Sequence, residues 1–269
     1  MFLNFTKGIP LNDLVNHREI IIQLTKRDII GRYKGSVLGL LWSFLHPLVL
    51  VIVYTVVFGF VFKAKWGVEL KQNFSILLFS GLIFHAYLSE CLVRSPTLII
   101  NNINLVKKVV FPLEVLSWVL TFSSMFHFFA SAIILFSAQY ILSGHVYITW
   151  LYLPLLLFPI TILCLGLGWL LSALSIFLRD ITQVTTIIST ILLFLCPIFY
   201  PMELVPSKFQ LFLYLNPLTF IVEQSRQIII YGNSPDIVGL FIYTCLIFVF
   251  TQISYIWFMK VRRYFADVL

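Results

Sequence analysis

Charged residues are scarce in this sequence: only 11% of its 269 residues are Asp, Glu, Lys or Arg. Hydrophobic residues make up 60% and aromatic residues 17%. A soluble domain of this length could not bury so much apolar surface, because polar side chains have to cover its exterior. The composition therefore excludes a soluble globular protein and indicates a chain whose solvent is the membrane.

Motifs for ATP hydrolysis and for metal binding are absent as well. No GxxxxGK[ST] phosphate-binding loop occurs, so the chain does not hydrolyse ATP by that route. The cysteines lie singly in apolar stretches, without the spacing of metal ligands or of a redox pair, and we interpret them as small core residues. They are Cys91, Cys164, Cys196 and Cys245. We expect no catalytic residue, metal or cofactor in this chain.

Six apolar stretches are long enough to cross a bilayer core, which takes about 20 helical residues. We therefore predict an all-α membrane protein with six transmembrane helices in one domain, residues 36–260. About 35 residues precede the first span, so we expect it to remain in the mature protein rather than to be cleaved as a signal peptide. The predicted spans are about 36–62, 74–93, 113–142, 150–178, 181–200 and 236–259.

Basic residues are divided unequally between the two predicted membrane faces. With the N-terminus inside, 13 of the 18 Lys and Arg residues lie on the cytoplasmic side. The positive-inside rule then places both termini in the cytoplasm, with residues 261–269 as a tail. Topology and anionic lipid account for the net charge of +7, so no nucleic-acid partner is needed. The outer five are Lys63, Lys65, Lys71, Lys208 and Arg226.

A seventh stretch, residues 211–230, is also long enough to span. It carries Asn216, Pro217, Glu223 and Arg226, and a further crossing would move the basic C-terminal residues outside. We predict instead a re-entrant helical hairpin on the outer side, within residues 201–232 and between spans five and six. Such backbone is tolerated only where protein or a water-filled cavity covers it, which hints at a pathway.

An amphipathic stretch leads into the first span. Because its apolar residues recur in pairs seven to eight positions apart, one helical face is apolar and the other polar. We predict that residues 1–35 hold a cytoplasmic interface helix that lies on lipid or packs on a partner protein. Gly35 and Gly39 then predict a close helix contact, and Pro47 a kink. The pairs are Leu14/Val15, Ile21/Ile22 and Ile29/Ile30.

A second polar segment, residues 94–111, connects spans two and three. It holds three asparagines and two lysines before Pro112, where a helix start is predicted because Glu114 follows in the first turn. A merely connecting loop could be far shorter. The length of this segment predicts a short surface helix that serves as a cytoplasmic docking site.

Five motifs, spread over almost the entire chain, carry a family resemblance. They are RDIIGRYKGSVLGLLWSFLHPL, NNINLVKKVVFPLEVL, FLRDI, PIFYPMELVP and LNPLTFIVEQSRQIIIYG. Together they resemble the permease subunits of type-2 polysaccharide-export ABC transporters, the Wzm, KpsM and TagG relatives that export O antigens, capsules and teichoic acids. The resemblance implies a multi-pass permease of the bacterial inner membrane that moves a lipid-linked polysaccharide outward.

The resemblance also implies the partners. Such permeases work as homodimers with two copies of a separate P-loop ATPase, which binds ATP and Mg. By carry-over, the ATPase coupling region holds Asn101, Asn102, Asn104, Leu105, Lys107 and Lys108. A lipid-linked phosphate or diphosphate head would be met by Arg32, Tyr33 and Lys34, with Arg94 as a further candidate unless it pairs with Glu90, four residues earlier.

A channel for an extended glycan needs weak, repeated contacts, which aromatic faces provide for sugar rings. Aromatic residues in spans also face lipid or fill cores, so each candidate has this alternative. Our channel candidates are Trp42, Tyr54, Phe58, Phe194, Phe199 and Tyr200.

Two other protein classes stay open at this point. A membrane-embedded transferase acting on lipid-linked sugars would find its best feature in His85 and Glu90, as a base and an orienting acid. A secondary transporter would need repeated halves and several intramembrane ionisable groups, of which His127 is one candidate. We interpret the lone histidines His46 and His127 as interior hydrogen-bonded groups, and Glu223 and Arg226 as a helix-stabilising pair.

Overall fold

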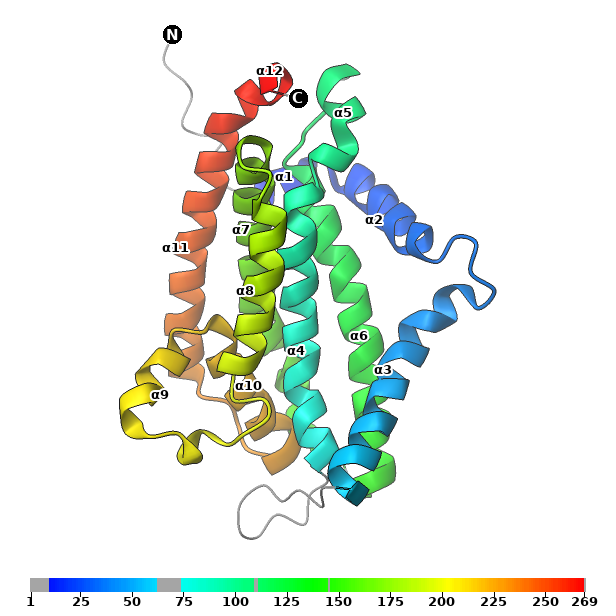
Figure 1. Ribbon diagram of the computed structural model, residues 1–269, viewed down its shortest axis with the longest axis vertical. Coiled ribbons are helices and arrows are strands. Elements are labelled where there is room, and N and C mark those ends of the chain that lie inside the picture. The colour runs from blue at the N-terminus through cyan, green and yellow to red at the C-terminus, as the bar shows by residue number, and fades with distance from the viewer. Residues whose placement is uncertain (1–9, 62–73, 109–110, 145, 269) are drawn as a thin grey trace.

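The computed structural model describes residues 10–61, 74–108, 111–144 and 146–268. Every regular element within these ranges is a helix, which confirms the all-α membrane class (Figure 1). The α-helices are α1 Pro10–Asn16, α2 Arg18–Arg32, α3 Trp42–Tyr54, α4 Phe74–Arg94, α5 Ile103–Lys108, α6 Val115–Ser143, α7 Leu153–Phe177, α8 Ile181–Leu195, α9 Ser207–Tyr214, α10 Pro217–Arg226, α11 Ile237–Val261 and α12 Phe265–Val268. Short 3-10 or π-helical turns extend several of them.

Five helical segments in the described ranges are long and apolar enough to cross a membrane. The predicted fifth span, 181–200, is represented by α8 with only 15 residues. At 1.5 Å per residue α8 is about 22 Å long, against a bilayer core of about 30 Å, so six full spans stay a prediction. The five segments are Gly39–Phe58, Phe74–Thr97, Val115–Ser143, Ile148–Phe177 and Ile237–Tyr264.

The helices that run along the bundle alternate in direction (Figure 1). The chain runs away from the end that holds α2 and α5 in α3, α6 and α8, and returns in α4, α7 and α11. As a result α12 ends beside α5, while α9 and α10 lie at the opposite end. The two short helices α9 and α10 lie within residues 201–232, and a re-entrant hairpin there stays a prediction.

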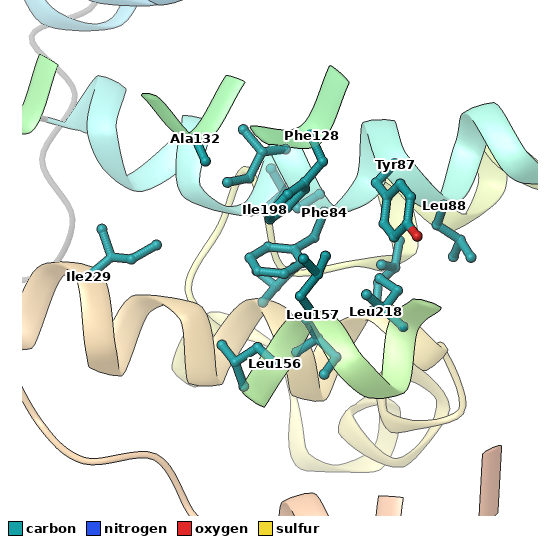
Figure 2. Packing of buried hydrophobic residues seen from close by; sticks show 14 of the residues in the cluster. Phe84, Tyr87, Leu88, Phe128, Ala132, Leu156, Leu157, Ile198, Leu218 and Ile229 are labelled. Carbon is teal, nitrogen blue, oxygen red and sulfur yellow. The ribbon is translucent and has the colours of Figure 1, made fainter. Parts of the chain in front are cut away.

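The main apolar core lies where α4, α6, α7 and α10 meet (Figure 2). Phe84 of α4 and Phe128 of α6 pack with ring centroids 5.0 Å apart. Leu157 of α7 and Leu218 of α10 close the core from the other side, and all four side chains are buried. Because α10 and the turn Gln227–Tyr231 share this core with three long helices, they are part of the folded unit.

A second core lies toward the α5 end, where α6, α7 and α11 meet the N-terminal helices. Its centre is the fully buried Trp169, whose Nε1 donates to the carbonyl of Glu114 at 3.0 Å. Ile21 of α2 is buried in the same cluster. The Glu114 carboxylate accepts a hydrogen bond from Arg262, which fixes the end of α11 to the start of α6.

The N-terminal stretch packs in part on its own bundle, and its contact with lipid or with a partner protein stays a prediction. One apolar side of α2 packs on α6, so Ile21 is 1% exposed, whereas its neighbour Ile22 is 65% exposed. The close helix contact predicted for Gly35 and Gly39 is wrong within this chain. Both glycines have positive φ, 89° and 52°, and no heavy atom in the described part of the chain lies within 4 Å of a Cβ added at either. They shape the turn between α2 and α3 instead.

Close packing of small residues holds α7 to α11. A Cβ added at Gly166 of α7 would lie 2.7 Å from Thr251 Oγ1, which itself donates to the carbonyl of Ile162 at 2.9 Å. Small residues at such crossings allow the helices to approach closely within a membrane.

We expect Gly166→Ala to destabilise the fold by about 1–3 kcal/mol, because the added methyl group forces α7 and α11 apart. The matched control is Gly31→Ala on α2, where no described heavy atom lies within 4 Å of the new Cβ, and which should be neutral or slightly stabilising. Thermal unfolding of both variants in the same detergent measures the difference. Equal melting temperatures for the two variants would contradict the packing argument.

Candidate functional site

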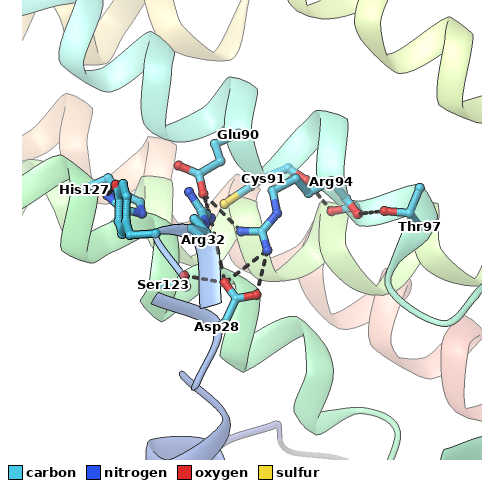
Figure 3. A network of polar contacts seen from close by, with 10 residues as sticks. Asp28, Arg32, Glu90, Cys91, Arg94, Thr97, Ser123 and His127 are labelled. Atoms are coloured by element: carbon cyan, nitrogen blue, oxygen red, sulfur yellow. Dashed lines mark hydrogen bonds and ion pairs between the residues drawn. The ribbon is translucent and has the colours of Figure 1, made fainter. Parts of the chain in front are cut away.

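An ion-pair network joins α2, α4 and α6 near the α5 end of the bundle (Figure 3). Arg94 Nη2 of α4 donates to both carboxylate oxygens of Asp28 on α2, at 2.8 and 3.0 Å. Arg94 Nη1 and Arg32 also pair with the Glu90 carboxylate. Ser123 of α6 donates to Asp28 at 2.5 Å. Two guanidinium groups and two carboxylates therefore neutralise one another at the place where the N-terminal helix meets the bundle.

The charged side chains of this network are partly buried. The four charged side chains are only 20–32% exposed, so each depends on its partners more than a surface pair would. Two of the predicted lipid-head contacts, Arg32 and Arg94, are thus already engaged by carboxylates. Lys34, by contrast, is exposed and has no carboxylate in ion-pair range among the residues described.

A polar pocket of about 220 Å³ adjoins the network, between α2, α3, α4 and α6. Tyr33 lies 3.4 Å from Nδ1 of His127, and their rings meet edge to face. The Nε2 of His127 is buried and has no hydrogen-bond partner in the described part of the chain. Burial raises the pKa of the Tyr33 hydroxyl, so this group stays a hydrogen-bond donor at neutral pH.

The predicted lipid-head residues therefore fall into two groups. Arg32 and Arg94 belong to the network that fixes α2, although Arg32 also borders the pocket. Tyr33 lines the pocket, and Lys34 follows it on the exposed turn. The proximity of Trp42 and His46 to the same pocket was not anticipated from their sequence positions.

A second polar seam connects α4 to α8. A ring nitrogen of His85 lies 3.0 Å from the carbonyl of Ser189, and Ser89 Oγ lies 2.5 Å from Ser189 Oγ. His85 is thus an interior hydrogen-bonded group. Since Glu90 is engaged by arginines, His85 and Glu90 do not form the base and acid of the transferase alternative.

The aromatic channel candidates form two separate sets. Tyr54 and Phe58 pack against the main core, with ring centroids 6.3 Å apart, while Trp42 is 45% exposed. Phe194 and Phe199 lie 6.0 Å apart at the end of α8, where the Tyr200 hydroxyl donates to the carbonyl of Phe194 at 3.0 Å. Helix α4 stands between α3 and α8 (Figure 1), so one chain alone does not bring the sets together.

The predicted coupling segment forms the tip of the α5 end. Asn101 and Asn104 are exposed there, whereas Asn102 Nδ2 donates to the carbonyl of Leu98 at 2.8 Å. Leu105 packs against the second core. Lys107 and Lys108 end α5, and their side chains lie outside the described residues, as do Lys63, Lys65 and Lys71.

Polar contacts to backbone groups tie the region of α9 and α10 to the bundle. Asn216 caps α10 by accepting from the amide of Leu218 at 2.9 Å. The hydroxyl of Tyr243 donates to the carbonyl of Pro217 at 2.7 Å, and Arg226 Nη2 donates to the carbonyl of Ile198 at 3.0 Å. Arg226, placed with the outer cations by its sequence position, is in fact 5% exposed.

Sequence reasoning missed several residues of this arrangement. Asp28 is central to the network although it stands in a basic stretch, and the available signal was its spacing of four from Arg32. Asp13 accepts from the hydroxyl of Tyr255, which attaches α1 to α11. No local signal pairs residues so far apart in the sequence. No group of three or more His, Cys, Asp or Glu placed to hold a metal occurs within the described ranges.

Comparison with known proteins identifies the class. The sequence profile of the ABC-2 type transporter family matches residues 19–230. The chain belongs to this family and is a multi-pass, non-enzymatic permease subunit of the bacterial inner membrane, as the motif resemblance predicted. Membership in this family implies partnership with an ABC ATPase subunit.

Two relatives illustrate the similarity. The O-antigen export system permease protein RfbA of Klebsiella pneumoniae is 26% identical over 254 residues, which cover 93% of this chain and 95% of the relative. An O-antigen export system permease protein RfbA of Myxococcus xanthus is 27% identical over 233 residues, covering 84% of this chain and 86% of the relative. In the comparison with the Klebsiella pneumoniae protein, the similarity thus extends over nearly the full length of both proteins.

We expect Asp28→Asn to loosen α2 from the bundle, because it leaves Arg94 facing an uncharged amide in a partly buried position. The expected loss is about 1–3 kcal/mol of stability, reduced from that of a fully buried pair by the remaining exposure. Limited proteolysis of α2 and thermal unfolding measure it. Glu19→Gln on the same helix is the matched control, since Glu19 is exposed and makes no ion pair within the described residues.

Equal stability and equal proteolysis of Asp28→Asn and Glu19→Gln would show that the network does not hold α2. The apolar contacts of Ile21 would then be what attaches α2 to the bundle.

Proposed function

We propose that this chain is the channel-forming permease of an ATP-driven exporter that moves a lipid-linked polysaccharide from the cytoplasmic to the outer side of the inner membrane. The similarity to O-antigen export permeases over more than nine-tenths of the chain carries this proposal. The glycan is of the O-antigen, capsule or teichoic-acid type. The end of the bundle that holds α2 and α5 faces the cytoplasm, and both termini lie on that side.

Two helices support a dimer with a channel between the copies. The most apolar window of α3 and its flanking turns is only 17% buried, against 72% for α4. Of the 15 residues of α8, only Thr185 and Ser189 are buried. Both helices border the bundle and carry the aromatic channel candidates. A second copy supplies the opposite wall, and the path runs between α3 and α8 of the two chains.

The exposed face of α8 suits a polysaccharide better than a purely lipid-facing helix does. Gln183, Thr186 and Thr190 are exposed along it, beside Ile187 and Phe194. The two threonine hydroxyls donate to carbonyls one turn earlier, at 3.1 and 3.2 Å, and each retains lone pairs for a sugar hydroxyl. α8 completes the sixth crossing together with residues 196–200.

The α5 end supports coupling to the ATPase. The segment 94–108 projects from the bundle beside α2 and α12 (Figure 1), where the exposed Asn101 and Asn104 are accessible to a cytoplasmic partner and Lys107 and Lys108 end α5. ATP binding to the partner pushes on this segment and on α2, and through residues 33–41 on α3. Tyr33 and Lys34 meet the phosphate of the lipid carrier, with Arg32 and Arg94 holding α2 in place.

Purification of the tagged chain from its native host in mild detergent tests the proposal. We expect a P-loop ATPase to co-elute at equal stoichiometry, and native mass spectrometry to give two copies of each subunit. A preparation that carries no ATPase even after crosslinking, and cells that keep exporting their surface glycan without this chain, would overturn the proposed function.

Charge reversal at the tip tests the coupling segment. We expect Lys107→Glu with Lys108→Glu to lower ATPase stimulation and glycan export about tenfold or more, because like charges at an interface disfavour association. Lys208→Glu, an exposed lysine at the opposite end, is the control and should leave both unchanged. Normal export and stimulation in the double variant, at normal membrane levels, would remove this segment from the mechanism.

A further inference from the structure

A second polar pocket, of about 400 Å³, lies at the end of the bundle that holds α9 and α10. It is bounded on one side by residues 201–203, which follow α8, and on the other by the end of α10 and the π-helical turn Gln227–Tyr231. Its volume falls within the range of about 300–1,000 Å³ that is typical of small-ligand sites. The ion-pair network lies at the other end of α4 and contributes nothing to it.

Charged groups of both signs line this pocket. Arg226 is buried within it, with Nη2 held by the carbonyl of Ile198 at 3.0 Å. Burial lowers the pKa of Arg226 to about 10, so it remains cationic at neutral pH. Glu223 is half-buried, and burial raises the pKa of its carboxyl while the charge of Arg226 opposes the rise. Glu203 is exposed.

Two side-chain amides of the pocket are held in fixed orientations. Gln224 Oε1 accepts from the backbone amide of Asp236 at 2.8 Å. Gln227 Oε1 accepts from Asn233 Nδ2 at 2.9 Å. Because each amide uses its oxygen within the protein, its NH₂ group stays available to donate to a ligand.

This mixture of groups determines the class of ligand. An anion would meet the carboxylates of Glu203 and Glu223, whereas a simple cation would meet the guanidinium of Arg226. A neutral ligand whose hydroxyl groups both donate and accept can satisfy the carboxylates, the guanidinium and the amides together. Tyr231 adds a ring face and a hydroxyl, which suit the apolar faces and polar edge of a sugar.

We propose that this pocket is a saccharide-binding subsite at the outer end of the export path. The inference rests on the proposed function, which supplies the glycan and places this end outside. It also rests on continuity with the channel candidates: Phe199 and Tyr200 are followed directly by Pro201, the first residue of the pocket lining. A glycan that leaves Phe199 and Tyr200, just after α8, thus reaches this pocket next.

Saturation-transfer NMR on the permease–ATPase complex in nanodiscs tests the subsite. The probe is the surface polysaccharide of the host cells, released from its lipid by mild acid and cut to short oligosaccharides. We expect Glu203→Ala and Tyr231→Ala each to weaken binding of the probe about tenfold, in line with the loss of a charge-assisted hydrogen bond or a ring contact. Tyr231→Phe should keep most of the binding because it keeps the ring.

The control is Lys208→Ala, an exposed residue of α9 outside the pocket lining, which should bind the probe like the unaltered complex. Unaltered binding in both Glu203→Ala and Tyr231→Ala, at normal export by the unaltered complex, overturns the subsite while the proposed function stands. In another outcome, added calcium binds to the unaltered complex and fails to bind to Glu203→Ala and Glu223→Ala while probe binding stays unchanged. That result would also overturn the subsite, in favour of a cation site. Failure of the unaltered complex to export any glycan is a failure of the proposed function instead.

Discussion

The four-membered network of Asp28, Arg32, Glu90 and Arg94 is the interaction on which the arrangement of the N-terminal half depends. Apolar burial alone does not orient α2, since lipid solvates isoleucine as well as protein does. Partly buried charges are different, because each must find an opposite charge or stay in water. The network therefore specifies where α2 meets α4 and α6, and the turn after α2 then determines where α3 begins.

Sequence reasoning predicted those features of the fold whose physical signal is local. Hydropathy predicted the long helices. The polar content of residues 211–230 argued against a further span, and the structure has the two short helices α9 and α10 over this range. The extent of α8 was harder to predict, because Cys196 ends the helix with an extended backbone within a continuous apolar stretch. The wrong prediction for Gly35 and Gly39 has a conformational cause: their positive φ values belong to a turn, and spacing alone does not reveal φ.

Site residues were less accessible to sequence reasoning, because their roles depend on partners distant in the chain. The spacing of Glu90 and Arg94 predicted a pair, and they do pair at 3.1 Å. Nothing local showed that Asp28 would complete the pair, or that Arg226 would be buried in a pocket. The channel candidates illustrate a further limit. The sequence of one helix does not show which of its faces would line the proposed path between two copies.

The long apolar helices are buried to very different extents. Helices α4, α6 and α7 bury half or more of their apolar windows, while the window of α3 buries 17% and that of α11 22%. Elements with few buried contacts open at the lowest free energy, whereas a shared core resists displacement. Helix α11 is nevertheless fastened to the bundle at both ends, through Tyr243 and Arg262. Helix α3 has the network of α2 at its start and one-sided packing along its length. Under the proposed function, α3 is therefore the element that can move while α4, α6 and α7 stay packed, as a gate at the edge of the bundle requires.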